Sequence, residues 1–259
     1  MRMATALKLT RALLLVCCAL LSSRLAIAQE QAERGSVRLQ QTLKELLGEQ
    51  QASRYQKIIS PEEAVSWQVF TPSNNSGEIP GVMVYVSPTK SGGIDPRWRA
   101  VMDEQNLIYI AANDSGNNVR VDRRMVLAIM AIKALAKQHP FTMDRIIVSG
   151  FSGGGRTASM LASQYPDLFS ATLYICGVDF WEKRTTPNVE RLIRNRFVFL
   201  TGSRDFNRDE TRRIHRSYLK AGAKHSKLMV IPGMSHQLPD GEALKEALLF
   251  LSGENPIEI

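Results

Sequence analysis

The alternation of short apolar runs with helical patterns constrains the fold of this chain more than any other feature. Seven runs rich in β-branched and aromatic residues predict strands, and from the third run onward segments with helical spacing of apolar residues separate them. The runs lie near residues 66–71, 82–87, 107–112, 145–149, 171–176, 197–201 and 228–231. Because parallel neighbours need a crossover, usually a helix, this order predicts an α/β fold with a mostly parallel central sheet flanked by helices.

Three segments outside these runs have the apolar spacing of helices. One is the almost wholly apolar segment between Arg124 and Lys137, which ends at His139-Pro140 and is expected to pack on the sheet. Another closes the chain with one apolar face, formed by Leu244, Ala247, Leu248 and Leu251. The third, between Ser36 and Gly48, is expected to pack outside the main domain and carries its leucines at Leu39, Leu43, Leu46 and Leu47.

The first 28 residues have the composition of a secretory signal peptide. Basic residues precede an apolar stretch from Ala12 to Leu21, and Ala26-Ile27-Ala28 supplies the small residues of a cleavage site. An uncleaved anchor is the alternative, although the stretch is short for a bilayer and Arg24 interrupts it. We therefore expect an exported protein, periplasmic or secreted, without stable membrane insertion. Its expected parts are a signal peptide (1–28), an N-terminal helical extension (29–62) and a main α/β domain (63–259).

Charge and cysteine content argue against a nucleic-acid partner and against a disulfide-stabilised fold. The chain carries +8, but the first 28 residues hold four of its 33 basic residues and none of its 25 acidic ones, which leaves +4 for the remainder. The basic residues do not cluster with aromatics along one element, so solvated helix faces explain them. Two of the three cysteines lie in the predicted signal, and the remaining one, Cys176, has the setting of a small buried hydrophobe.

One of the predicted strands breaks into a glycine-rich turn and reopens as a helix. Residues 145–157 read R-I-I-V-S-G-F-S-G-G-G-R-T and contain the pattern G-x-S-x-G centred on Ser152. In this pattern the serine occupies a strained strand-to-helix turn, and Gly150 and Gly154 relieve the crowding around it. The amide of Gly153 then points toward an oxyanion forming at the serine. The segment predicts a nucleophile elbow with Ser152 as the nucleophile.

The same turn also lies one substitution away from a phosphate-binding loop. Residues 150–157 match G-x-x-x-x-G-K-T except that Arg156 replaces the lysine that reaches the terminal phosphates. No strand further along the chain ends convincingly in a magnesium-binding aspartate. The missing lysine and aspartate favour the hydrolase interpretation.

A serine nucleophile needs a histidine to accept its proton and a carboxylate to orient that histidine. Asp205 follows the predicted strand 197–201, and His236 follows the strand 228–231. Ligands of such sheets gather beyond the carboxyl ends of the strands, so both side chains are expected beside Ser152. Asp179 and Asp209 are the alternative acids.

A metal or cofactor is not expected. The spacing Asp205-x-Asn207-x-Asp209 resembles the start of a calcium loop, but Glu210 replaces the required glycine and Arg216 the closing bidentate glutamate. Hydrolysis through a serine nucleophile needs no cofactor.

In these motifs the sequence resembles the α/β-hydrolase superfamily, especially exported esterases similar to the polyhydroxybutyrate-depolymerase and feruloyl-esterase groups. The resemblance covers roughly residues 64–252 and rests on Gly-Phe-Ser-Gly-Gly, Gly-Ser-Arg-Asp and Gly-Met-Ser-His. The order serine, acid, histidine is also that of this fold. The resemblance implies that Ser152 is the nucleophile, His236 the general acid–base and Asp205 its orienting carboxylate.

The second oxyanion donor has no clear motif. Gly153 is predicted to give the first amide, but the His-Gly pair that such hydrolases usually carry after the third strand is absent. The loop that takes its place begins Ser87-Pro88, and Pro88 has no amide hydrogen. Among Ser87, Thr89 and Lys90 we expect Thr89 to donate.

Contacts to the substrate are expected from two loops. Only residues 177–195 separate the strand ending at Cys176 from the next, which leaves no room for a sizeable lid domain, and Phe180 and Trp181 are candidates to line the open cleft. Packing onto the core is the alternative for both aromatics. Asn113 and Asp114 follow the strand 107–112 at the same sheet edge, where they could contact the substrate or only form a turn.

These features together predict an exported serine hydrolase, specifically a carboxylester hydrolase that forms an acyl-enzyme intermediate. The expected substrate is a small-molecule or polymeric ester, and the oligomeric state is left open. A peptidase like the prolyl oligopeptidases is the enzymatic alternative, although the propeller of such enzymes is missing. A hydrolase-like binding protein with a decayed catalytic site is the non-enzymatic alternative.

Overall fold

The structure is a computed structural model that describes residues 36–73, 77–180 and 189–253. Contacts divide the chain into Met1–Ser36 and Val37–Ile259, and the fold described below is that of the second unit. The predicted signal peptide and residues 181–188, which include Trp181, lie outside the described residues.

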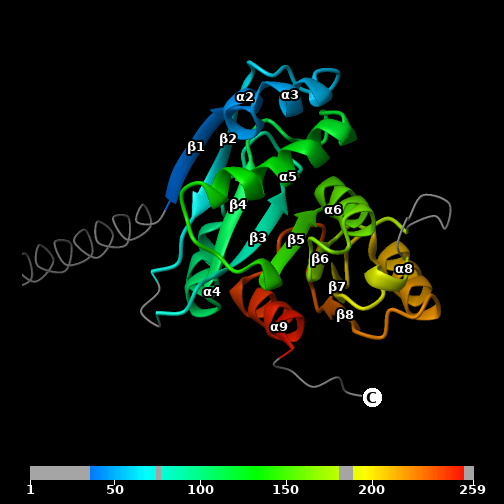
Figure 1. The fold of residues 1–259 in the computed structure, drawn as a ribbon. Coiled ribbons are helices and arrows are strands. Elements are labelled where there is room, and N and C mark those ends of the chain that lie inside the picture. The colour runs from blue at the N-terminus through cyan, green and yellow to red at the C-terminus, as the bar shows by residue number, and fades with distance from the viewer. Residues whose placement is uncertain (1–35, 74–76, 181–188, 254–259) are drawn as a thin grey trace, which may run out of the picture. The chain divides into compact units, whose positions relative to one another are not determined.

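The second unit is built on an eight-stranded sheet with the order β1-β2-β4-β3-β5-β6-β7-β8 (Figure 1). Strand β2 runs antiparallel to β4, and the strands from β4 to β8 run parallel to one another. The predicted mostly parallel sheet is therefore confirmed. The strands are β1 (Ser36–Thr42), β2 (Ala64–Phe70), β3 (Gly81–Val86), β4 (Leu107–Ala112), β5 (Ile146–Phe151), β6 (Ala171–Ile175), β7 (Arg196–Gly202) and β8 (Ser226–Ile231).

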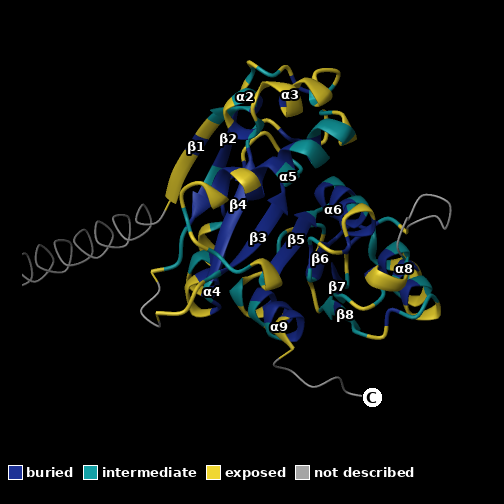
Figure 2. Cartoon of the chain, viewed as in Figure 1, coloured by how far each residue is buried: buried dark blue, intermediate teal, exposed yellow. Residues whose placement is uncertain are grey.

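Helices cover both faces of the sheet, and the core lies between the layers (Figure 2). Apolar side chains of α2, α5, α6 and α8 pack on one face, and those of η2, α4 and α9 on the other. Strand residues alternate between these faces, as Val84 and Tyr85 of β3 show. The helices are α2 (Leu43–Leu47), α3 (Glu49–Ala52), α4 (Arg99–Glu104), α5 (Val121–Ala136), α6 (Gly153–Gln164), α7 (Val189–Leu192), α8 (Arg208–Lys220) and α9 (Gly241–Ser252), with 3-10 turns η1 (Ser53–Tyr55), η2 (Pro96–Trp98) and η3 (Met143–Arg145).

The helix expected between Ser36 and Gly48 is wrong in its first half. Strand β1 occupies residues 36–42 at the edge of the sheet, and the helix begins only at Leu43. The Thr42 hydroxyl caps this helix by accepting from the Glu45 amide, and the Glu45 carboxylate accepts from the Thr42 amide. The capping box sets the helix start, which the leucine spacing alone does not reveal.

No helix in the described part of the chain has the length and apolar character needed to cross a bilayer. The predicted export segment lies outside that part, so export and cleavage remain predictions.

Candidate active site

The predicted elbow joins β5 to α6 near the middle of the sheet. Ser152 lies between them with φ 55° and ψ −121°, a backbone conformation that residues with a side chain rarely adopt. The close approach of neighbouring segments explains the glycines around it. A Cβ on Gly154 would lie 1.9 Å from the Val86 carbonyl oxygen, and one on Gly150 would lie 2.4 Å from the Gly154 carbonyl. Only glycine fits at either position.

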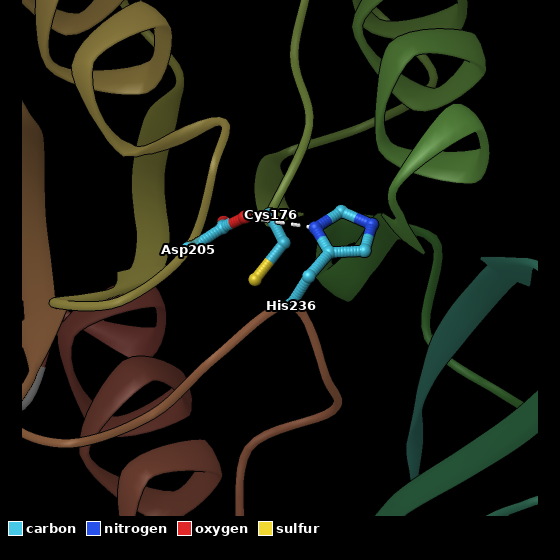
Figure 3. Close-up of side chains that lie close together, drawn as sticks. All are labelled: Cys176, Asp205 and His236. Carbon is cyan, nitrogen blue, oxygen red and sulfur yellow. Dashed lines mark hydrogen bonds and ion pairs between the residues drawn. The ribbon is translucent and has the colours of Figure 1, made fainter.

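The structure brings together the three side chains predicted for the proton relay. Nε2 of His236 lies 2.9 Å from Oγ of Ser152, and Nδ1 lies 2.8 Å from Oδ1 of Asp205. The Asp205–His236 contact is drawn in Figure 3. Asp205 comes from the loop after β7 and His236 from the loop after β8. The three residues therefore meet at the carboxyl edge of the sheet.

Asp205 is held as a carboxylate by donors around it. Its side chain is fully buried, the Thr201 hydroxyl donates to Oδ2 at 2.7 Å, and the Asn207 amide donates to Oδ1 at 3.0 Å. Burial alone raises the pKa of the Asp205 carboxyl, but these donors and the His236 ring outweigh it and hold the pKa below its usual value. The carboxylate is therefore ionised at neutral pH and oriented toward the imidazole.

Cys176 lies beside the relay at the end of β6. Its backbone has φ 52°, its side chain is buried, and Sγ lies 3.7 Å from the Gln237 carbonyl oxygen. Ligand atoms of Cys176, Asp205 and His236 lie within 4.8 Å of one another, the spacing of a possible metal cluster (Figure 3). Burial raises the pKa of the Cys176 thiol and so disfavours the thiolate that a metal needs. The arrangement suits a proton relay better, and a metal-free site remains a prediction.

Two phenylalanine rings lie against the His236 imidazole. The ring centroid of Phe151 lies 4.9 Å from that of His236, and the centroid of Phe206 lies 4.1 Å away with the planes 30° apart. Phe206 is 77% exposed, so its outer face is open to a ligand. The sequence interpretation missed both rings. The available signal was their position, since Phe151 directly precedes Ser152 and Phe206 directly follows Asp205.

The two predicted oxyanion donors have different surroundings. Gly153 is the first residue of α6, where an amide has no carbonyl partner within the helix, and the Ser152 side chain does not cap it. The exposed Thr89, in contrast, donates its amide to Oγ of Ser87 at 3.1 Å. Gly153 is thus poised for an oxyanion, whereas the Thr89 amide would have to give up its present partner. The role of Thr89 remains a prediction.

The predicted substrate-contacting residues are placed as follows. Asn113 links β2 to the loop after β3, because its amide group donates to Ser66 Oγ and its Oδ1 accepts from the Gly92 amide. Asp114 is exposed in a turn with φ 50°. Phe180 packs edge-on against Tyr218 and is 39% exposed, while Trp181 lies outside the described residues. Their contacts with substrate remain predictions.

The alternative interpretations of the charged residues fit the structure poorly. Arg156, which stands at the P-loop lysine position, pairs with Asp179 at 2.6 Å and with Glu210. Its guanidinium is occupied by carboxylates, so it is not free to bind phosphate. The same pairing engages Asp179, and the exposed Asp209 pairs with Arg208 at 3.0 Å. Neither alternative acid contacts His236.

A cavity of about 240 Å³ lies next to the elbow. Phe151 and Leu238 connect it to the His236 region, and Ser87 and Thr89 connect it to the predicted oxyanion loop. Its other lining residues are three buried aromatics, Tyr85, Trp98 and Tyr109, together with Pro88, Ser91, Gly93 and Asp95. A larger and more polar hollow of about 380 Å³ lies at the opposite edge, before β5, β6 and β7, far from this chemistry.

Part of the chain matches a protein-family model. Residues 127–235 match the model of the prolyl oligopeptidase family, a span that includes Ser152 and Asp205 and ends one residue before His236. No curated protein sequence matches the chain.

Solved structures share the fold at low sequence identity. A ferulic acid esterase superposes with a TM-score of 0.61 at 15% identity, over 84% of this chain and 98% of the other. An ester-hydrolase from the metagenome of Lake Arreo, complexed with a bipyridine phosphonate derivative, gives 0.60 at 15% identity over 89% of each chain. A thermostable esterase gives 0.55 at 15% identity over 74% of this chain, which spans only 59% of that esterase. Its sheet order, its elbow and these superpositions show that the chain has the α/β-hydrolase fold.

Proposed function

We propose that the protein is an exported serine hydrolase that cleaves carboxylic esters. The observation that carries the proposal is the continuous hydrogen-bond chain from Ser152 Oγ through His236 to Asp205. A hydroxyl becomes an effective nucleophile when a positioned imidazole accepts its proton and a carboxylate stabilises the resulting imidazolium. Export is proposed from the N-terminal sequence alone.

The members of this hydrogen-bond chain act in turn during the reaction. Ser152 Oγ attacks the ester carbonyl carbon while His236 Nε2 takes its proton, and the tetrahedral oxyanion is bound by the Gly153 amide. His236 then protonates the departing alcohol, which leaves an acyl group on Ser152. Water activated by the same imidazole releases the acid and restores the serine.

The cavity beside the elbow limits the group that the enzyme accepts. At about 240 Å³ it is smaller than the sites that enclose drug-sized ligands, and four aromatic side chains line it. A short acyl chain or a single ring fits such a space better than a long fatty acid. We therefore propose esters of compact carboxylic acids or alcohols as substrates.

The proposal is tested with short-chain aryl esters and a fluorophosphonate probe. Wild-type protein is expected to hydrolyse the esters and to be labelled, whereas Ser152→Ala loses both, with turnover lower by on the order of 10⁶-fold. Ser217→Ala, on the outer part of α8, is the matched serine control and is expected to retain activity and labelling. Absence of turnover and labelling in the wild type would contradict the proposal and favour a binding protein.

A peptidase is the second candidate because the matching family model is that of the prolyl oligopeptidases. An aminoacyl amide in the same substrate panel separates the two activities. Cleavage of the amide at a kcat/KM equal to or above that of the matched ester would establish the peptidase.

A further inference from the structure

Arg124 is a buried charge without a carboxylate partner. It lies in the first turns of α5 and is only 4% exposed. Within the described part of the chain, no Asp or Glu pairs with its guanidinium, and burial lowers the pKa of the group. Arginine nevertheless stays protonated in proteins. A positive charge is therefore kept inside the molecule, where an unpaired charge is normally costly.

The guanidinium is satisfied by three backbone carbonyls from three different segments. Nε donates to Ser115 at 2.8 Å, Nη1 to Gly153 at 3.2 Å and Nη2 to Ser87 at 3.1 Å. Ser115 belongs to the loop after β4, Ser87 follows β3, and Gly153 opens α6. The planar fork of arginine can hold three acceptors at fixed relative positions, which lysine cannot do.

Two of these segments are the ones proposed to bind the oxyanion. Arg124 donates to the carbonyl of Gly153, the residue whose amide is proposed to bind the oxyanion. It also donates to the carbonyl of Ser87, at the start of the loop that carries Thr89.

The third segment is in turn attached to that loop. The Asn117 amide donates to the Pro88 carbonyl at 2.9 Å, and the Asp114 amide donates to the Lys90 carbonyl at 2.7 Å. The Asn117 side chain also lies against Gly153, because a Cβ there would be 2.3 Å from Asn117 Oδ1. Arg124 therefore holds the centre of a backbone cluster that surrounds the oxyanion position.

The geometry points to Arg124 as the positioning residue of the oxyanion hole, a buried cation that fixes the Gly153 amide relative to the loop after β3. This inference rests on the proposed hydrolase function. Arg124 acts at that position by fixing the distance between the two sides of the hole, because it binds the carbonyl of Gly153 on one side and that of Ser87 on the other. Correct placement of the donors stabilises the transition state more than the bound ester.

Arg124→Met and Arg124→Lys test the inference through kcat, KM and transition-state affinity. Arg124→Met removes all three hydrogen bonds and is expected to lower kcat on the order of 10- to 100-fold, with KM changed by less than about threefold. Affinity for an aryl boronic acid, which forms a tetrahedral adduct with the serine, is expected to fall by the same factor as kcat/KM. Arg124→Lys keeps the charge but not the fork, and it is expected to recover only part of the loss.

The neighbouring Arg123 gives the control. Its guanidinium pairs with Glu63 on another side of α5, so Arg123→Met is expected to leave kcat and boronate affinity unchanged. Thermal unfolding shows whether each variant is folded. If Arg124→Met does not fold, the folded Arg124→Lys protein decides, since a residue with only a packing role would leave kcat at the wild-type value. If Arg124→Lys has the kcat of the wild type, the role of Arg124 is overturned but the hydrolase function stands. If the wild-type protein is itself inactive, both the hydrolase function and the role of Arg124 are overturned.

Discussion

The two halves of the proposed active site are built by different means. The relay half consists of the side chains of Ser152, His236 and Asp205, which are joined by hydrogen bonds of 2.8 and 2.9 Å. The oxyanion half consists of backbone groups, and Arg124 binds the carbonyls of Gly153 and of Ser87, the first residue of the loop after β3. A side-chain function requires particular residue types and is visible in a sequence. A backbone function requires only that peptide groups be held in place, so its residues have few obligatory identities.

Asp205→Asn breaks the relay half alone and is expected to have the largest effect of these variants. Asparagine keeps the shape of the side chain but favours the wrong imidazole tautomer, so His236 no longer accepts the serine proton. We expect kcat to fall on the order of 10⁴-fold. Steady-state hydrolysis of an aryl ester measures the loss.

Asp209→Asn is the matched control for this variant. Asp209 lies four residues away, is exposed and pairs with Arg208, so its amide variant is expected to retain wild-type kcat. A larger loss in Asp209→Asn than in Asp205→Asn would show that the acid has been misassigned.

Sequence reasoning succeeded where a residue type is obligatory or where a long apolar pattern exists. The seven predicted strands are confirmed within a few residues, and the structure brings Ser152, Asp205 and His236 into contact. A serine after G-x, an aspartate after one strand and a histidine after the next are readable because chemistry demands these side chains. The parallel topology then predicts where they meet.

The remaining features depend on contacts that no local pattern encodes. Arg124 looks like the end of an ordinary helix in the sequence, and its three acceptors are carbonyls that every residue carries. The stacking of Phe206 on His236 depends on how the loop after β7 closes, and β1 depends on an open edge of the sheet. In each case the tertiary fold selects one of several locally acceptable roles.

The cavity adjoins both halves, and Leu238→Ala is expected to change the size of the group it accepts. Leu238 follows His236 by two residues and lines the cavity together with the loop that contains Ser87. Shortening this side chain enlarges the space by a few methylene groups, and each such group is worth about 1–3 kcal/mol in a hydrophobic pocket. We expect the ratio of kcat/KM for a longer over a shorter substrate to rise about tenfold.

Two substrate series then show which part of the ester occupies the cavity. One series lengthens the acyl chain of an aryl ester, and the other lengthens the alcohol of an acetate ester. If the ratio of kcat/KM for longer over shorter substrates rises only in the first series, the cavity binds the acid part of the substrate. If the ratio rises only in the second series, the cavity binds the alcohol. An unchanged ratio in both series would remove the cavity from the substrate site.

Phe206→Ala is expected to have a smaller effect, on substrate binding at the relay half. The exposed face of this ring offers an apolar surface directly over His236, where the departing alcohol must receive its proton. Loss of the ring is expected to raise KM for aryl esters about threefold to fivefold and to leave KM for methyl esters almost unchanged, because an aromatic contact is worth about 0.5–1.5 kcal/mol. Phe180→Ala distinguishes the two exposed phenylalanines, because Phe180 packs on Tyr218 and a packing role would lower stability without raising KM.

Thr201→Val gives the finest distinction between the halves, through the pH dependence of stability. Donors including the Thr201 hydroxyl lower the pKa of Asp205 in the folded protein, so their stabilisation is complete above the unfolded pKa of about 3.9 and is lost as pH falls through the folded value. Removing one donor narrows the gap between the two pKa values. Denaturant unfolding at pH 7 is therefore expected to show a loss of about 1–2 kcal/mol in Thr201→Val, and the difference from wild type shrinks as pH falls from 4 to 3.

The three groups that Arg124 binds are backbone carbonyls, which do not titrate, and this makes Arg124→Lys the natural comparison for Thr201→Val. In the wild type, the Arg124 guanidinium binds neutral carbonyls, so protonation of carboxylates does not change the contacts that the substitution removes. The stability difference between Arg124→Lys and wild type is expected to stay constant between pH 7 and pH 3. A difference that narrows with acid as it does in Thr201→Val would show that the two halves are coupled electrostatically, and the separation between side-chain and backbone functions would then fail.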